Sequence, residues 1–359
     1  MKIHNFSAGP CILPAEVLQK ASDAVKEFDG IGLSLIEISH RSKEFVKVMD
    51  DAQQLVKDLL NVPDNYSILF LQGGASLGFY ITALNFLKEG ETAHYINTGT
   101  WSKKAIKEAK LVGDVNILAS SEDKNFNYIP KGFDLPTTGS YLHYTTNNTI
   151  FGTQFQELLK TDIPLIADMS SDIFSRPVNV SDYAMIYAGA QKNMGPAGTT
   201  LYIVNNDVLN SINKTLPSML DLKVHIDKDS MFNTPPVFPI YTSMLTLQWM
   251  KDLGGLTEIE KINAAKAELL YSEIDNNPLF KGAAAVEDRS KMNVTFLLND
   301  ESLQDDFNKM WNDAGVSGIK GHRSVGGYRA SIYNAMPLSS VQALVDVMKE
   351  FANKFAVKA

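Results

Sequence analysis

The feature that most constrains the fold is a regular alternation of short apolar runs with helical stretches through the middle of the chain. The strand-like runs are residues 66–71, 93–96, 141–145, 163–167, 184–188 and 200–204, and stretches such as 76–87 and 102–110 have helical patterns. Strands that alternate with helices are typical of a mainly parallel sheet covered on both faces. The sequence therefore predicts an α/β fold, and 359 residues exceed what one hydrophobic core usually carries.

The pattern changes after Pro239. Long helices are predicted at 241–253 and 257–274, with a break at Gly254-Gly255, and mixed elements follow: strands at 292–298 and 329–332, helices at 305–313 and 339–355. We expect a large domain over residues 16–254. Residues 1–15 and 255–359 are predicted to form a smaller α+β domain, mainly carboxyl-terminal.

Composition narrows the class of protein. With 45% hydrophobic and 21% charged residues, the chain has the composition of an ordinary globular protein, and no apolar run is long enough to span a bilayer. The amino terminus lacks the apolar stretch of a signal peptide, so a cytoplasmic location is expected. The single cysteine, Cys11, excludes an internal disulfide or a cysteine-based metal cluster and is most simply a small packed residue.

The net charge of −8 and the pI near 5.3 argue against non-specific nucleic-acid binding. Any anion must therefore meet a local cationic cluster, and two such clusters are present. The basic residues of the first are His40, Arg41 and Lys43, and those of the second are Lys320, His322, Arg323 and Arg329. Arginine grips carboxylate or phosphate with two parallel hydrogen bonds. The alternative is a solvated charged loop, which fits the two lysines well but explains Arg329, on a predicted strand, poorly.

Two successive apolar runs are each followed by a residue that could take part in catalysis. The run at 163–167 is followed by Asp168, and the run at 184–188 by Lys192, 24 residues further on. Because ligands collect outside the carboxyl ends of parallel strands, both side chains are predicted to face one crevice. Pyridoxal phosphate needs this pair, a lysine to form a Schiff base and a carboxylate to keep the pyridine nitrogen protonated. An ordinary surface lysine and a helix-capping aspartate remain the alternatives.

Two further features follow predicted strands. The glycine-rich turn at 70–78 opens a helix, so its backbone N–H groups and the helix dipole favour an anion such as phosphate. It lacks the dinucleotide and P-loop patterns, and a purely geometric role for its glycines is an equal alternative. Trp101 has an aromatic face that suits stacking on a planar ring, or it is a core tryptophan at a helix start.

Several segments together resemble the phosphoserine aminotransferases, class-V enzymes of fold type I that use pyridoxal phosphate. The resemblance covers about residues 3–355, and its motifs lie at 5–10, 39–41, 187–198, 230–236 and 321–335. It implies a large domain around a mainly parallel seven-stranded sheet, a smaller α+β domain, and a homodimer with active sites shared between subunits.

The resemblance also implies roles for individual residues. Those around the cofactor ring are Lys192 as the linking lysine, Asp168 on the pyridine nitrogen, Trp101 stacking on the ring, and Thr149 on the phenolic oxygen. Those around the cofactor phosphate are Ala75, Ser76 and Gln191, with Asn233 and Thr234 from the neighbouring subunit. Those around the substrate are Arg329 on the α-carboxylate, His322 and Arg323 on the phosphate, and His40 and Arg41 from the neighbouring subunit.

The implied reaction is transfer of the amino group between glutamate and 3-phosphohydroxypyruvate, giving O-phosphoserine and 2-oxoglutarate in serine biosynthesis. Whether the chain also serves pyridoxine biosynthesis, by acting on 3-hydroxy-2-oxo-4-phosphooxybutanoate, stays open. The chain departs from many members at Ala8, where they carry serine, and at Ser76, where they carry arginine. A cysteine desulfurase is disfavoured by the position of Cys11, and a glyoxylate aminotransferase has no use for a phosphate-sized basic pocket. A protein that only binds small anions is disfavoured because the lysine, aspartate and tryptophan are all present.

Overall fold

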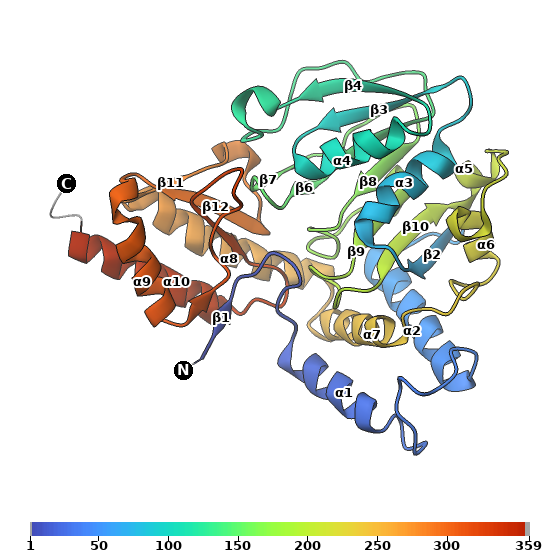
Figure 1. Ribbon diagram of the computed structural model, residues 1–359, viewed down its shortest axis with the longest axis horizontal. Coiled ribbons are helices and arrows are strands. Elements are labelled where there is room, and N and C mark those ends of the chain that lie inside the picture. Colours follow the sequence, from blue (N-terminus) through green and yellow to red (C-terminus); the bar gives the residue numbers. More distant parts are fainter. Residues whose placement is uncertain (1, 356–359) are drawn as a thin grey trace.

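The computed structural model describes residues 2–355 and centres on a seven-stranded sheet (Figure 1). Its strands, in spatial order, are β2 (Tyr66–Leu71), β10 (Thr200–Asn205), β9 (Met185–Gly189), β8 (Leu165–Asp168), β5 (Tyr141–Thr145), β3 (Thr92–Asn97) and β4 (Asp114–Ser120). Only β10 runs in the direction opposite to the other six strands. The predicted mainly parallel sheet is confirmed, and the other six strands all end at one edge.

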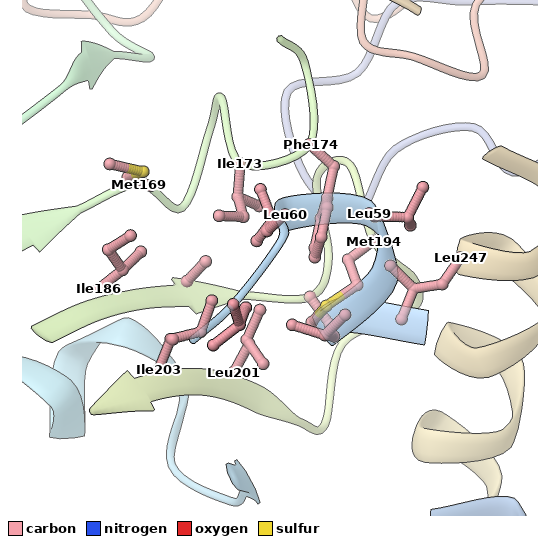
Figure 2. Close-up of a cluster of buried hydrophobic side chains, with 14 of the residues drawn as sticks. Leu59, Leu60, Met169, Ile173, Phe174, Ile186, Met194, Leu201, Ile203 and Leu247 are labelled. Carbon is pink, nitrogen blue, oxygen red and sulfur yellow. The ribbon is translucent and has the colours of Figure 1, made fainter. Parts of the chain in front are cut away.

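Helices cover both faces of this sheet, because alternate side chains of the buried strands are apolar on both sides. The helices on one face are α3 (Gly74–Phe86) and α4 (Thr100–Ala109), which share a core with Tyr95 and Tyr187 of the strands. The helices toward the other face are α2 (Lys43–Leu60) and α7 (Val237–Asp252), with α1 (Ala15–Lys26) packed on α7. Figure 2 shows part of the core on this face, with Leu59 and Leu247 of the helices and Ile186, Leu201 and Ile203 of the sheet among the labelled side chains.

Two strands of the large sheet differ from the prediction by more than one residue at an end. β4 was not predicted, because it lies at the edge of the sheet and most of its side chains are exposed or half-buried, leaving no clear apolar pattern. β8 was predicted at 163–167 but spans Leu165–Asp168. Pro164 has no N–H to give to the ladder, so the strand begins after it and extends into Asp168.

The carboxyl-terminal part builds a second core beside the large sheet, as Figure 1 shows in orange and red. Its three-stranded sheet has the order β11 (Phe280–Gly282), β12 (Asn293–Leu298), β14 (Tyr328–Ser331). Its helices are α8 (Leu256–Asn276), α9 (Gln304–Asp313) and α10 (Leu338–Phe355). The amino-terminal strand β1 (His4–Asn5) pairs in parallel with β13 (Val316–Ser317), and Phe6 enters this core. The first and last elements of the described range therefore belong to one unit.

Helix α8 connects the two cores. Ile259 in its first turns belongs to the core of the large sheet, and Leu270 belongs to the second core. The predicted domain boundary at residues 254 and 255 falls one residue before this helix and stays a prediction. The remaining α-helices in the described range are short: α5 (Asn206–Asn210) and α6 (Leu222–Ile226). Within residues 2–355, no helix is both long and apolar enough to traverse a lipid bilayer.

A short hairpin joins the two parts of the molecule. It consists of β6 (Asn147–Asn148) and β7 (Thr153–Gln154) and follows β5. Its turn is held by the second unit, since Ser290 N–H donates to the Gly152 carbonyl at 2.8 Å and Thr295 Oγ1 donates to the Phe151 carbonyl at 3.0 Å. Two hydrogen bonds from the carboxyl-terminal part of the molecule therefore hold the hairpin turn.

Candidate active site

The parallel strands bring four of the predicted residues to one edge of the sheet. Asp168 is the last residue of β8, and Lys192 lies three residues beyond β9. Trp101 is the second residue of α4, which follows β3, and Thr149 lies in the hairpin turn after β5. Because these strands are parallel, their carboxyl ends lie at a common edge of the sheet. Asp168 and Lys192 are close enough there for the charge of each to shift the pKa of the other, and the crevice that they would share stays a prediction.

Lys192 is a buried amine with a defined partner. Its side chain is 9% exposed, and Nζ donates a hydrogen bond to Thr149 Oγ1 at 2.7 Å. Nζ also lies 5.7 Å from the centroid of the Trp101 ring. Burial lowers the pKa of the amine to about 8, and the nearby Asp168 carboxylate partly opposes that effect. With this pKa about one tenth of the amine is neutral at pH 7, far more than of an ordinary lysine, and the neutral amine is a competent nucleophile and base.

Asp168 is the negative counterpart of Lys192. It is 3% exposed, and its Oδ1 accepts a hydrogen bond from Ser170 N–H at 2.9 Å. Burial raises the pKa of this carboxyl, whereas the hydrogen bond from Ser170 and the Lys192 charge lower it. Within residues 2–355 the carboxylate makes no salt bridge, so it remains available to a cationic group of a ligand.

Trp101 presents an aromatic ring beside the Lys192 amine. It is half-buried and packs against the core of α3 and α4 and against the small cluster of Ile150 and Phe151. Its Nε1 is buried and has no hydrogen-bond partner in the described part of the chain. A ring supported in this way, with one buried donor still free, suits stacking against a planar ligand.

The glycine-rich turn before α3 places backbone N–H groups at the same edge. Gly73 precedes the helix with φ of 104°, in the left-handed region, and a Cβ there would come within 2.4 Å of the Leu77 side chain. The N-cap residue, Gly73, has no side chain to cap this helix, and the first N–H groups, at Gly74, Ala75 and Ser76, have no acceptor within the helix. Ala75 is half-buried and Ser76 is exposed. The turn has the conformation of an anion site.

Gln191 lies between the large sheet and the amino-terminal segment. Its side chain is half-buried, and a Cβ on Gly189 would come within 2.6 Å of its Oε1. Its backbone carbonyl accepts a hydrogen bond from the N–H of Cys11 at 3.2 Å. Close packing against Gly189 therefore fixes the residue before Lys192.

Arg329 belongs to the carboxyl-terminal part of the molecule and approaches Thr149 from there. It lies on β14, and its Nη1 donates to the Thr149 carbonyl at 3.4 Å. Its Nε is buried without a hydrogen-bond partner, and it makes no salt bridge to any residue of the 2–355 range. Burial lowers the pKa of the guanidinium, which nevertheless stays charged. A half-buried guanidinium with no acidic partner can donate hydrogen bonds to a carboxylate.

His322 and Arg323 lie on a tight turn close to Arg329. The turn is closed by a 2.8 Å hydrogen bond from Gly321 N–H to the Gly327 carbonyl. His322 is half-buried, and its Nδ1 shares a 2.7 Å hydrogen bond with the Ser324 hydroxyl, whereas Arg323 is exposed. Burial first, then the charges of Arg329 and Arg323, lower the pKa of His322. Three basic side chains therefore lie close together, and an anion would relieve their repulsion.

Four predicted site residues lie in other parts of the chain. His40 is half-buried, with Nε2 unpaired among the described residues, and Arg41 is exposed just before α2. Asn233 and Thr234 are exposed in the segment before α7, where the Thr234 carbonyl accepts from Gln72 Nε2 at 2.7 Å. Their assignment to a neighbouring subunit stays a prediction.

The sequence did not indicate the residues whose hydrogen bonds hold the backbone around Lys192. The Cys11 thiol donates to the Lys192 carbonyl at 2.5 Å, and the Tyr333 hydroxyl donates to the Ala8 carbonyl at 2.8 Å. Asn193 Oδ1 accepts from the N–H of Asn334 at 3.1 Å. These contacts join segments more than 100 residues apart, so no local pattern could have indicated them.

Known proteins match this fold and this site. The family profile described as Aminotransferase class-V matches residues 3–344. The phosphoserine aminotransferase of Flavobacterium johnsoniae is 59% identical over 355 residues, covering 99% of this chain and 100% of that protein. The chain belongs to the class-V aminotransferases. Within that class it belongs with the phosphoserine aminotransferases.

Solved structures agree. One, from work on radiation damage of the Schiff base in a phosphoserine aminotransferase, has a TM-score of 0.95 and 46% identity, covering 98% of this chain and 99% of that chain. Another, the pyridoxal-phosphate-bound phosphoserine aminotransferase of Trichomonas vaginalis, has a TM-score of 0.91 and 36% identity, covering 97% of this chain and 100% of that chain. Fold type I, predicted from the sequence, is therefore confirmed.

Proposed function

We propose that the chain transfers an amino group between glutamate and 3-phosphohydroxypyruvate, using pyridoxal phosphate, with Lys192 as the residue that holds the cofactor. The reaction yields O-phosphoserine and 2-oxoglutarate, the transamination step of serine biosynthesis. The proposal rests on two features that lie close together. One is the Lys192 amine, which is buried and has a lowered pKa. The other is a group of basic side chains with no acidic partner among residues 2–355, namely Arg329, His322 and Arg323.

The residues present fit the cofactor. Trp101 Nε1 is a buried donor without a partner in the described chain, and Asp168 is a buried carboxylate without a salt bridge there. The uncapped start of α3 at Gly74, with Ala75 and Ser76, offers backbone N–H groups to a phosphate, helped by Gln191. Lys192 would hold the reactive carbon, Asp168 would pair with the pyridine nitrogen, Trp101 would stack on the ring, and Thr149 would bond its phenolic oxygen. When bound, the cofactor supplies an electron sink that stabilises a substrate carbanion.

Lys192 performs the proton transfer. Its Nζ, neutral in part near neutral pH, takes the proton from the α-carbon of glutamate and later returns it at a neighbouring atom. Thr149 Oγ1 holds Nζ at 2.7 Å and so limits the positions it can occupy. The negative charge of Asp168 would stabilise a positive charge on the pyridine nitrogen of the cofactor.

Arg329 and its neighbours orient the substrate. Arg329 would bind the α-carboxylate that both amino acids and both keto acids carry. His322 and Arg323 would bind the phosphate of phosphoserine or the side-chain carboxylate of glutamate, since both groups are anions placed beyond the reacting carbon. One basic pocket thus serves both halves of the reaction.

A test of Lys192 follows directly. In the Lys192→Ala variant the visible absorption of bound cofactor and the transamination of phosphoserine with 2-oxoglutarate should both be lost. Lys107→Ala, which removes an exposed lysine from α4, is the matched control and should retain both. Turnover at the wild-type rate by Lys192→Ala would refute the assignment.

We also propose that two chains form a homodimer with shared sites, in which His40, Arg41, Asn233 and Thr234 act on the partner's pocket. The support is their position beside exposed apolar side chains. The large apolar residues exposed in these two segments are Ile31, Leu33, Ile36 and Phe232. Exposed apolar side chains gathered in such segments are typical of an interface between subunits.

Mixing two inactive variants tests this arrangement. Lys192→Ala and Arg41→Ala, co-refolded in equal amounts, place one intact site in each mixed dimer and should restore about one quarter of wild-type activity, given random pairing of a two-fold dimer. No recovery, from variants that light scattering shows to be dimers, would contradict the shared site. A monomer by light scattering would contradict the dimer itself.

A further inference from the structure

Lys266 is a fully buried lysine that the proposed chemistry does not use. It lies on α8 with an exposure of 0%, and it forms no salt bridge with any residue of the described range. Its Nζ donates to the carbonyls of Ile332 at 2.9 Å, Tyr333 at 2.6 Å and Asn334 at 3.5 Å. Burial lowers the pKa of this amine to about 7. A buried amine is costly unless its hydrogen bonds are satisfied, and here three backbone carbonyls satisfy them.

The three carbonyls belong to the segment that follows β14, the strand that carries Arg329. An ammonium has three N–H groups and can satisfy three converging carbonyls, which an apolar side chain of similar length would leave unpaired. Lys266 therefore fixes the backbone directly after the strand of Arg329.

From this segment, one hydrogen-bonded path leads to the residue after Lys192. The Asn334 side chain accepts from Asn263 Nδ2 at 2.8 Å and donates to the Phe174 carbonyl at 2.9 Å. Its backbone N–H donates to Asn193 Oδ1 at 3.1 Å. Asn334 is therefore held on three sides and in turn holds the neighbour of the catalytic lysine.

A second path reaches Lys192 from the amino-terminal segment. The Tyr333 hydroxyl donates to the Ala8 carbonyl at 2.8 Å and accepts from Asn293 Nδ2 at 3.1 Å. Three residues further along, the thiol of Cys11 donates to the Lys192 carbonyl. The two paths start at Asn334 and Tyr333, whose carbonyls accept hydrogen bonds from Lys266. The first ends at the Asn193 side chain and the second at the Lys192 carbonyl.

We propose that Lys266 is a positioning residue that fixes the backbone of Lys192 relative to Arg329, acting through Tyr333 and Asn334. The inference rests on the proposed function, because it assigns Lys266 to the same site. Lys266 touches neither the reacting amine nor the substrate-binding guanidinium. Its effect is to keep the two at a constant separation, on which the alignment of the substrate α-carbon with Nζ depends.

The experiment compares Lys266→Met with Lys261→Met. Lys261 lies on the same helix, is exposed, and pairs only with Glu258 at 3.1 Å, so its substitution controls for loss of a lysine from α8. Each holoenzyme is assayed for kcat and KM, and its visible band is titrated against pH. For Lys266→Met we expect kcat to fall roughly 10- to 100-fold, the loss typical of a misplaced reacting group, with a smaller change in KM. The midpoint of the spectral titration should shift, because the environment of Nζ changes. Lys261→Met should match the wild type.

Asn193→Ala keeps the test decisive if Lys266→Met does not fold. This variant removes the acceptor of Asn334 N–H and leaves the three contacts of Lys266 intact. It should reproduce the fall in kcat and the spectral shift. A lower melting temperature with unchanged kcat and unchanged spectral midpoint, in either folded variant, would overturn the positioning role and leave a purely structural one.

The spectral titration separates this inference from the proposed function. It requires only that the cofactor binds to Lys192, whatever the substrate is. A wild-type protein that binds the cofactor but does not transaminate phosphoserine would contradict the proposed function. The spectral comparison of Lys266→Met with Lys261→Met would still support or overturn the role of Lys266.

Discussion

Lys192 and Thr149 lie 43 residues apart in the chain, and a hydrogen bond of 2.7 Å joins the Nζ of one to the Oγ1 of the other. The same threonine offers its backbone carbonyl to Arg329. Thr149 therefore connects the proposed nucleophile with the proposed carboxylate-binding group. The hairpin turn that carries it is fixed by the second unit of the molecule, so this geometry depends on contacts between both parts.

Replacing Thr149 with valine keeps the shape of the side chain but removes the acceptor. A hydrogen bond to a charged amine is worth about 1.5–3 kcal/mol, so kcat should fall roughly 10- to 100-fold. The pKa of Lys192 should fall as well, because the protonated amine loses its partner. Steady-state kinetics check the first effect. Thr149→Ser keeps the hydroxyl and should stay close to the wild type; an equal loss in Thr149→Ser would show that the hydroxyl alone does not account for the effect.

The rate at which the apoprotein takes up pyridoxal phosphate should depend on pH with a midpoint near that of Lys192. Only the neutral amine attacks the aldehyde, and burial lowers the pKa of this amine to about 8. The neutral fraction is about one tenth at pH 7, one half at pH 8, and nearly complete above pH 9. Stopped-flow absorbance should therefore show a rate that rises with pH and levels off above pH 9. A midpoint near the ordinary lysine value of 10.5 would contradict the burial argument.

Asp168→Asn should lower turnover about 100- to 1000-fold, the usual cost of removing one charge that stabilises a transition state. Because the Asp168 charge raises the pKa of Lys192, its loss should also move the midpoint of cofactor uptake to lower pH. Asp162→Asn removes an exposed carboxylate before the start of the same strand and serves as the control. Unchanged uptake in Asp168→Asn would show that the two groups do not interact.

Substitutions of the basic residues should change KM for the two substrates in different ways. Arg329→Lys should raise KM for glutamate and for 3-phosphohydroxypyruvate alike, by roughly 10-fold or more, because both carry the α-carboxylate. His322→Ala should weaken 3-phosphohydroxypyruvate more than glutamate. Lys320→Ala, in the same segment but exposed, should change neither KM. Equal losses for both substrates in His322→Ala would reject its assignment to the phosphate.

Much of the fold was predictable because buried strands leave a clear apolar pattern. β2 and β5 have the predicted ends, since turn or polar residues bound each run. The edge strand β4 was not predictable, because its half-exposed side chains carry no such pattern. Secondary structure was therefore readable where burial was complete.

The site was predictable where it depends on strand ends. Spacing alone placed Asp168 and Lys192 at neighbouring strand ends, and β8 and β9 are indeed adjacent in the sheet. The contacts of Asn193 and Tyr333 were not predictable, because polar pairs distant in sequence leave no periodic signal. Roles for His40 and Arg41 came from resemblance and await the mixing experiment.

The buried thiol of Cys11 has a practical consequence for spectroscopy. Burial raises its pKa to about 12, so almost none of it is thiolate at neutral pH and alkylating dyes should react with it slowly. A cysteine introduced at an exposed position would then be the preferred site of coupling without prior removal of the native one. Donor and acceptor fluorophores attached in this way, one on each side of α8, would report any change in separation between the two cores while the enzyme turns over.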